Sequence, residues 1–406
     1  MTDNNKTLKR SLSLTMITFF GLGNILGAGI YVLVGKVAAE AGYFAPLAFF
    51  VASIIAAISA FTFAELSARY PVSAGEAVFL HEGLNIRFLT IAVGLMITLA
   101  GMISTSALTH GFVGYLSVFV DWPHWLMMVA IILLLGGLAA WGISESVMVA
   151  SLLTLVEVVG LLLIVFVGTD FLISTEHAIK EVNLSLGGIP WLGVFSGAFL
   201  AFYAYIGFED MVTVAEEVKE PEKNMPRAII LALVISTVLY AAVSIVAVMV
   251  VEPRQLSLSA APLAEVYTVA TGREPVLISL IGIFAVINGA LIQIIMASRL
   301  LYGMAVKGWL PRYLAQIHAT TRTPLHSTLV VVFIILFFAL SLQLVTLAEL
   351  TSYLILIVFA LVNLSLIKIK QKNPRPDKVK LVSVWVPRLG FISASGFLLL
   401  KLVSNF

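Results

Sequence analysis

The sequence predicts an all-α integral membrane protein with about eleven transmembrane helices. Three observations carry this prediction: 60% of the 406 residues are hydrophobic, only 11% are charged, and the mean hydropathy is +1.06. Soluble domains carry about 25% charged residues, so this chain is too poor in charge to cover a water-facing surface. The short alternating runs typical of membrane β-strands are absent, which favours helical spans.

A helix that crosses the membrane needs about 20 apolar residues. By this length criterion, the predicted spans lie near residues 13–40, 45–68, 88–119, 124–142, 147–173, 191–215, 227–251, 275–305, 326–343, 346–367 and 387–404. The last segment gives the weakest signal, because Arg388 and Lys401 stand near its ends.

The basic residues predict a cytoplasmic N-terminus. Of the 24 lysine and arginine residues, the opposite side then holds only Lys36, Lys180, Arg254, Arg273 and Lys401. Cytoplasmic loops are enriched in these residue types. We therefore expect a multi-pass protein of the plasma membrane, or of the inner membrane in a bacterium, without a cleaved signal peptide. The basic linker at 368–380 is interpreted as a determinant of topology, with lipid-headgroup or partner binding as the alternative.

Several classes of chemistry are excluded. A net charge of +2 predicts no nucleic-acid partner, and the lack of cysteine excludes disulfides and thiolate catalysis. The six histidines show no metal-ligand spacing, and neither a nucleophile elbow nor a phosphate loop occurs. We therefore expect no enzyme activity, no metal and no cofactor.

Two of the predicted spans are interrupted. Span one contains Gly21, Gly23, Gly27 and Gly29, and span six contains a glycine and two acids in the run 202–210. Close helix packing is the alternative reading of the glycines. Interrupted helices in corresponding positions, here five spans apart, indicate an inverted-repeat transporter site. The freed N–H groups suit a carboxylate and the freed carbonyl groups suit an ammonium group, so a zwitterionic amino acid fits both.

Four motifs then occur in order along most of the chain, at 23–31, 64–76, 202–228 and 297–324. Together they resemble the amino acid–polyamine–organocation (APC) superfamily. The resemblance implies a five-plus-five inverted-repeat core of the leucine-transporter type, with helices one and six broken and alternating access around a central site. It also implies that residues 1–406 form a single transporter domain, with repeats at 13–173 and 191–367 and a basic linker and peripheral span at 368–406.

The matching positions imply a substrate site at the two breaks, formed by Asn24, Ile25, Gly27, Ala28, Gly29, Ile30, Phe202, Tyr203, Ala204, Tyr205 and Ile206. In the family the carboxylate lies at N–H groups after the first break, and the amino group lies at carbonyl groups of both breaks. The resemblance makes Tyr203 an aromatic lid over the substrate. Asn24 is expected either to bind the substrate or to tie the two halves of its helix together.

The chain departs from the family pattern in three places. Ala74 and Ala77 replace a double glycine and tyrosine found in many members, and about eleven spans fit instead of twelve. Glu157 stands where the fifth helix of many members carries a lysine in place of a sodium ion. The coupling argument based on that lysine therefore does not transfer, and neither proton nor sodium coupling is singled out.

Carboxylates inside the membrane are costly and are usually functional. Glu157 is expected to couple transport to a proton or cation, with a structural hydrogen bond or a contact with a cationic substrate as alternatives. Glu209 is expected to act in coupling, gating or amine binding, with a helix cap as the alternative; for Asp210 the cap is preferred. Glu65, Arg69 and Arg299, with Glu216 and Glu217, are expected to close the inner gate, with solvated helix ends as the alternative.

Further polar residues lie on spans three and eight. Ser104, Thr105, Ser106, Asn288 and Gln293 either line the pocket or form hydrogen bonds between helices, and the second use is the more common. His110 is interpreted as a buried core residue.

Together these expectations describe secondary active transport of an amino acid or related amine, by proton-coupled symport or by exchange. The expected partners are the substrate, protons and the lipid bilayer, and the sequence does not predict an oligomeric state. A membrane sensor or partner subunit that binds an amino acid without transporting it is the alternative. A channel is disfavoured because no continuous polar stripe or charged ring occurs.

Overall fold

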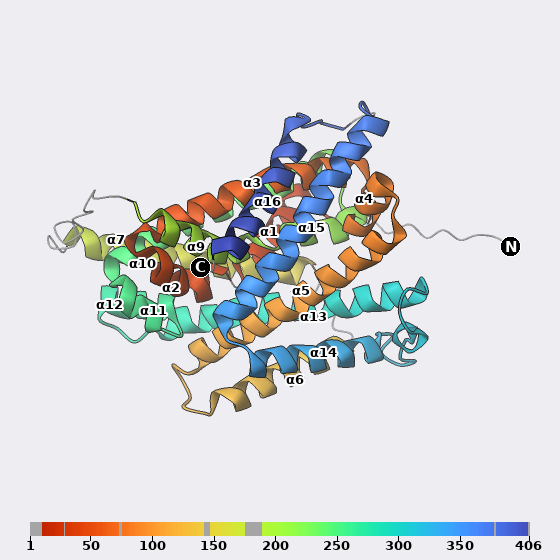
Figure 1. Ribbon diagram of the computed structural model, residues 1–406. Coiled ribbons are helices and arrows are strands. Elements are labelled where there is room, and N and C mark those ends of the chain that lie inside the picture. The colour runs from red at the N-terminus through yellow and green to blue at the C-terminus, as the bar shows by residue number, and fades with distance from the viewer. Residues whose placement is uncertain are drawn as a thin grey trace.

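A computed structural model describes residues 10–27, 29–72, 75–141, 147–174, 189–376 and 379–404. These residues are almost entirely helical and contain no β-strand (Figure 1). The long helices are α1 (Leu14–Leu26), α2 (Gly29–Ala41), α3 (Ala45–Arg69), α5 (Arg87–Leu116), α6 (His124–Trp141), α7 (Val147–Ser174), α9 (Trp191–Phe202), α10 (Pro221–Val250), α13 (Val276–Val306), α14 (Leu325–Ser341), α15 (Leu344–Lys372) and α16 (Trp385–Ser404).

Shorter helices lie between them. They are η1 (Gly42–Phe44), α4 (Gly75–Leu84), η2 (Tyr203–Tyr205), η3 (Glu209–Glu217), α11 (Pro253–Leu258), α12 (Pro262–Thr271) and η4 (Arg312–Ala315). The connections use ordinary capping chemistry. Ser13 accepts a hydrogen bond from the N–H of Met16 at the start of α1, and Gly272 ends α12 with a φ of +65°.

The expected number of spans is confirmed. Among the described residues, nine helical segments are long and apolar enough to cross a membrane, and one of these, Leu14–Arg69, is 56 residues long and contains the first two predicted spans. The shorter apolar helix Leu325–Ser341 accounts for the remaining span. At 1.5 Å per residue, 56 residues are far too long for one crossing of a hydrocarbon core about 30 Å thick.

Nine of the long helices pack as two groups. Helices α1, α2, α3, α9 and α10 contact one another, while α5, α6, α13 and α14 form a second group that runs alongside (Figure 1). Helix α7 contacts α1, α10 and α13, so it joins the two groups. Large apolar side chains such as Phe166 and Phe333 are more than 70% exposed, as expected where a helix faces lipid.

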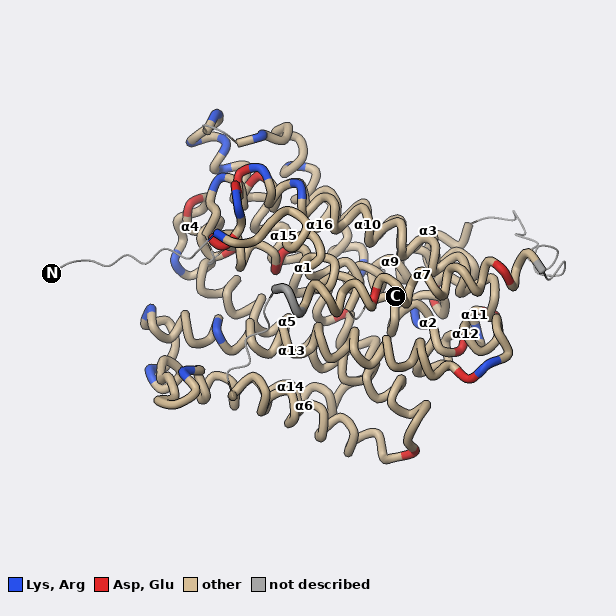
Figure 2. Tube along the Cα trace, turned by 180° about the vertical axis from the view of Figure 1, so that it is seen from behind, with Lys and Arg blue, Asp and Glu red and all other residues tan. Residues whose placement is uncertain are grey.

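Charge is distributed unequally between the two ends of the bundle. Lysine and arginine residues gather at the end where α4 lies and α15 finishes, and the opposite end carries few (Figure 2). This basic end of the bundle corresponds to the side on which the sequence places most of its basic residues.

Candidate functional site

The two helix breaks predicted from the sequence are present and pack directly against each other. The first lies between the end of α1 at Leu26 and the start of α2 at Gly29. The second follows η2, where Ile206 is extended and Gly207 has a φ of +130°. A Cβ atom built on Gly29 would lie 2.3 Å from the Cα atom of Ala204, and one on Gly207 would lie 2.6 Å from the carbonyl group of Asn24. Each break therefore needs a glycine because the backbone of the other break occupies the space of a side chain.

A small cavity lies between the breaks. Its volume is about 20 Å³, which is room for about one water molecule. No charged side chain lines it within the part of the chain that the structure describes. Its lining comes from both breaks and from the second helix group: Asn24, Ile25, Gly27, Gly29, Ser104, Leu108, Tyr203, Ile206, Gly289 and Gln293.

Asn24 presents an unused hydrogen-bond donor at this cavity. Its side-chain Nδ2 atom is buried and has no hydrogen-bond partner among the described residues. A buried amide without a partner costs free energy, on the order of 1–3 kcal/mol, so such groups usually have a ligand or a water molecule to bind. Because α2 begins at Gly29, the first N–H groups of that helix also lack acceptors within the helix. Donors thus converge on the cavity from the first break.

Tyr203 closes one side of the cavity. Its hydroxyl group lies 2.9 Å from the Oγ atom of Ser104 and 3.2 Å from the carbonyl oxygen of the same residue. Ser104 belongs to α5 in the second helix group, so this contact joins the second break to the opposite group. The ring of Tyr203 is therefore positioned by a hydrogen bond that must break if the two groups separate.

Tyr240 of α10 is a residue of the site that the sequence analysis did not single out. Its hydroxyl group lies 2.7 Å from the carbonyl oxygen of Ile25 and 2.9 Å from that of Ala204. These carbonyl groups belong to the first and second breaks, so one side chain bridges both. Each carbonyl oxygen keeps a second lone pair for another donor. A tyrosine in an apolar span gives no local signal of this role.

A second cavity, also about 20 Å³, continues from the first toward the end of the bundle where α13 finishes. Ser104, Ile206 and Gln293 line both cavities. The second one adds two carboxyl groups, those of Glu209 and Asp210. The path that leads from the breaks toward the basic end of the bundle is therefore acidic.

Each of these two carboxyl groups has a defined partner. Glu209 accepts a hydrogen bond of 2.9 Å from the N–H group of Gly207, and this bond stabilises the backbone of the second break. Asp210 accepts one of 2.9 Å from Nε2 of Gln293 on α13. Asp210 thus links the second break to the opposite helix group, a contact that its expected role as a helix cap does not include.

Glu76 on α4 lies near this acidic pair and outside the membrane-spanning helices. It is only 7% exposed. Burial, with a smaller contribution from the nearby charge of Asp210, raises the pKa of its carboxyl group to about 8. Glu76 therefore keeps a proton at neutral pH in the folded protein.

Glu157 lies in the interior beside the first break. It is 1% exposed, and its Oε1 atom accepts a hydrogen bond of 3.1 Å from Nδ2 of Asn288 on α13. The carbonyl oxygen of Glu157 accepts the hydroxyl of Tyr31, one turn after the first break, at 2.7 Å. One helical turn earlier, Thr154 lies so close to Gly23 that no Cβ atom fits there. Glu157 is thus in contact with both helix groups next to the site.

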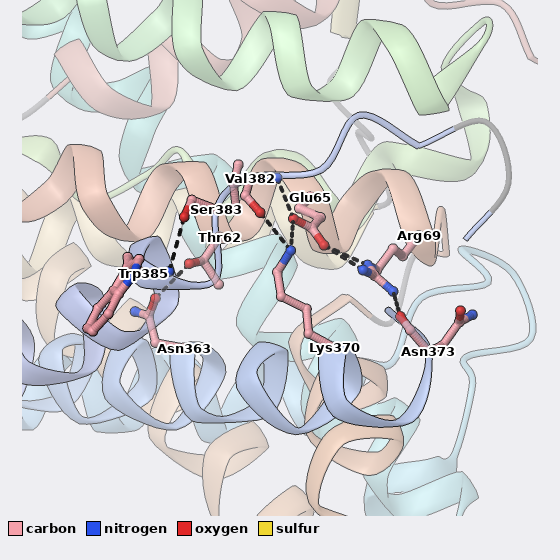
Figure 3. Close-up of polar contacts among 9 residues, drawn as sticks. All are labelled: Thr62, Glu65, Arg69, Asn363, Lys370, Asn373, Val382, Ser383 and Trp385. Atoms are coloured by element: carbon pink, nitrogen blue, oxygen red, sulfur yellow. Dashed lines mark hydrogen bonds and ion pairs between the residues drawn. The ribbon is translucent and has the colours of Figure 1, made fainter. Parts of the chain in front are cut away.

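The predicted gate residues Glu65 and Arg69 form part of a buried ion cluster at the basic end of the bundle (Figure 3). Nη2 of Arg69 lies 2.7 Å from Oε1 of Glu65, and Nζ of Lys370 lies 2.8 Å from its Oε2. The N–H group of Val382 donates to the same Oε2 atom at 2.7 Å. Arg69 also donates to the carbonyl oxygen of Asn373 at 2.9 Å. The cluster therefore holds α3 against α15 and against the linker that follows α15. The sequence did not predict Lys370 or this linker as a partner of Glu65.

The remaining predicted site residues lie apart from the cavities. Arg299 is exposed and makes no ion pair within the described residues, so the structure does not bring it to Glu65. Phe202 packs against Phe359, and Tyr205 packs against Tyr240. Ile30 is fully buried, Ala204 contacts Gly29 without lining the cavity, and Ala28 lies outside the described residues.

The fold matches solved transporter structures. A crystal structure of the manganese transporter of Eremococcus coleocola superimposes with a TM-score of 0.63 and 15% identity, covering 99% of this chain and 90% of that one. The shared fold is the five-plus-five leucine-transporter type, with helices one and six broken. At 15% identity, this match establishes the fold.

Residues 12–406 match the family model described as amino acid permease, so the chain belongs to that family within the APC superfamily. It is 28% identical to the methylthioribose transporter of Bacillus subtilis (96% of this chain, 87% of the relative). It is also 27% identical to the branched-chain amino acid permease BcaP of the same organism (92% and 83%). A mitochondrial cationic amino acid transporter of Arabidopsis thaliana is 30% identical, over 94% of this chain and 65% of the relative.

Proposed function

We propose that the protein carries a small neutral amino acid, or a related amine, across the plasma membrane by secondary active transport. The observation that carries this proposal is the cavity between the two interlocked breaks, where the unpartnered Nδ2 atom of Asn24 lies. Donors from the first break suit a substrate carboxylate, and the carbonyl groups of both breaks suit an ammonium group. The neutral lining, with Leu108 and Ile206, favours an apolar side chain over a cationic one.

The mechanism that we propose is alternating access. A cavity of about 20 Å³ is too small for an amino acid, so the two helix groups must separate to admit one. The contacts that would open are those that join the groups near the site, above all Tyr203 with Ser104 and Asp210 with Gln293. We also assign residues 13–173 and 191–367 as the two inverted repeats, and 368–406 as a linker and peripheral span.

We propose that Glu157 and Glu209 couple transport to protons or to exchange. Both are buried next to a break, and both hold hydrogen bonds that depend on the position of that break or of α13. A change in their protonation would therefore alter the contacts that hold the two groups together. Sodium remains an alternative coupling ion within the same proposal.

The test is counterflow in proteoliposomes loaded with leucine, arginine or methylthioribose, which represent the three kinds of named relative. We expect leucine to exchange and Asn24→Ala to weaken its uptake by roughly tenfold, the cost of one buried hydrogen bond to a charged group. If a compound binds but none of the three shows counterflow, the result would contradict transport. It would favour the alternative of a membrane sensor that binds an amino acid without transporting it.

Coupling is tested separately, by uptake under an imposed pH gradient. We expect Glu157→Gln and Glu209→Gln to remove the response to the gradient while exchange continues. Asp170→Asn is the matched control, because Asp170 is an exposed carboxylate on the same helix as Glu157. A gradient response that survives in both glutamine variants would remove the two residues from the coupling proposal.

The orientation is also a proposal: the N-terminus and the basic end of the bundle face the cytoplasm. The chain has no cysteine, so single cysteines can be introduced and labelled without background. We expect Arg254→Cys to react with an impermeant reagent in intact cells and Arg312→Cys to react only after lysis. The reverse pattern would invert the topology.

A further inference from the structure

A third cavity lies at the basic end of the bundle, away from the helix breaks. Its volume is about 330 Å³, at the lower end of the range of roughly 300–1,000 Å³ that is usual for ligand pockets. It is bounded by α4, by the turn into α5 and by the residues that follow α13. The polar side chains that line it are His81, Asn85, Arg87, Thr90, Lys307 and Trp309.

The charge in this cavity is positive and is not neutralised by the protein. Neither Arg87 nor Lys307 forms an ion pair with any residue that the structure describes, and no carboxylate lines the cavity. Nζ of Lys307 lies 5.1 Å from the ring centroid of Trp309, a cation–π contact that holds the lysine at the cavity. The first turn of α5, which begins at Arg87, carries no acidic residue. An anion would therefore meet two cations and no competing charge.

The residues beside the two cations are apolar and exposed. Ile86 and Phe88, which flank Arg87, are 48% and 76% exposed, and Val306, which precedes Lys307, is 58% exposed. Exposed apolar side chains on a membrane-spanning helix face hydrocarbon, and tryptophan is enriched at the level of the headgroups. The cavity thus lies at the boundary between hydrocarbon and water, where a soluble anion has no apolar surface to match but a phospholipid does.

We propose that this cavity binds the phosphate headgroup of an anionic phospholipid between Arg87 and Lys307, with the acyl chains along Phe88 and Val306. Basic pockets between transmembrane helices suit anionic headgroups, because each lysine or arginine near such a surface contributes on the order of a fivefold gain in binding. A bound lipid would join the turn between α4 and α5 to the end of α13. The proposal does not depend on which substrate the central site takes.

The test is lipid retention on the purified full-length protein, measured by native mass spectrometry from micelles that contain phosphatidylglycerol or phosphatidylcholine. We expect the wild type to retain phosphatidylglycerol preferentially and the double variant R87Q/K307Q to retain roughly thirtyfold less. The matched control is R227Q/R312Q, which removes two exposed cations that line no part of the cavity. We expect its retention to stay within about threefold of the wild type.

Three outcomes would overturn the proposal. Equal losses in the two double variants would reduce the effect to general surface charge. Equal retention of the two lipids would remove the preference for an anionic headgroup. Displacement of the lipid by an equal concentration of glycerol 3-phosphate would assign the cavity to a soluble anion. If R87Q/K307Q does not fold, Ala77→Glu places a carboxylate in the cavity without removing a cation, and phosphatidylglycerol retention must fall in that variant for the proposal to stand.

Discussion

The hydroxyl group of Tyr240 lies 2.7 Å from the carbonyl oxygen of Ile25, at the first helix break. The same hydroxyl lies 2.9 Å from the carbonyl oxygen of Ala204, at the second break. One oxygen atom on an unbroken helix therefore holds the unwound parts of two others at a fixed separation. This bridge stands beside the carbonyl groups that the family resemblance assigns to the substrate amine, so the geometry of the site depends on it.

Tyr240→Phe is expected to destabilise the protein by about 1–3 kcal/mol, because two buried carbonyl groups lose a donor while the ring is kept. We also expect the apparent substrate affinity to fall, since the two breaks are no longer held together. Thermal unfolding in detergent and uptake kinetics measure the two effects. Tyr267→Phe is the control, because the hydroxyl of that half-buried tyrosine on α12 makes no hydrogen bond within the described residues. Equal effects of the two changes would remove the special role of Tyr240.

Gly207→Ala is expected to abolish transport and to cost more stability than Gly272→Ala. Both glycines have a positive φ, so both substitutions carry backbone strain: roughly 1–2 kcal/mol at the left-handed φ of Gly272 (+65°), and more at the φ of Gly207 (+130°), which lies outside that region. A Cβ atom on Gly272 meets open space, whereas one on Gly207 would lie 2.6 Å from the backbone of Asn24. The difference between the two variants in melting temperature therefore reports the contact between the breaks together with the additional backbone strain at Gly207. Similar melting temperatures would show that this contact is not tight in solution.

Glu65→Gln is expected to destabilise the protein more than Lys370→Met. The first change leaves two buried cations, Arg69 and Lys370, without their shared carboxylate, and breaking a buried pair in this way costs about 3–5 kcal/mol. The second change leaves Glu65 paired with Arg69.

Lys223→Met supplies the scale for this comparison, because Lys223 and Glu220 form an ion pair with both side chains about two thirds exposed. We expect that control to cost less than about 1 kcal/mol. Urea or thermal unfolding of the three variants gives the order, and a Glu65→Gln variant as stable as the control would show that the cluster is solvated.

Glu76 is expected to make the folded protein less stable as pH rises. Its carboxyl group has a pKa of about 8 in the folded state, against an ordinary value of 4.5. Between these values the folded state holds a proton that the unfolded state has released, so stability falls as pH increases through this window, by at most about 1.4 kcal/mol per pH unit. Below about pH 4.5 both states are protonated and the effect is absent.

Glu76→Gln should remove this part of the pH dependence and raise the melting temperature at pH 8, since glutamine resembles the protonated acid. Glu82→Gln is the control, because Glu82 is an exposed carboxylate on the same helix. Parallel melting curves of wild type and Glu76→Gln from pH 5 to pH 8 would contradict the raised pKa.

The candidate site was only partly predictable. The glycines of span one and the run 202–210 identified both breaks, because a glycine or acid inside an apolar helix stands out in the sequence itself. The role of Tyr240 could not be predicted in the same way, because a tyrosine in an apolar span has many uses. Arg299 was predicted to be a gate residue from its position near a helix end, yet it is exposed. Lys370 was interpreted only as part of a basic linker, yet it is the residue that reaches Glu65.

The sequence by itself determined the membrane environment, the number of spans, the positions of the two breaks and the unequal distribution of basic residues. These follow from local composition, because lipid requires each span to be apolar and to satisfy its own backbone hydrogen bonds. The tertiary structure alone decided which residues meet: Glu157 with Asn288, 131 positions later, and Glu65 with Lys370, 305 positions later. Helices that are apolar on every side can pack in many rotations, so their partners are fixed only when the whole bundle is assembled.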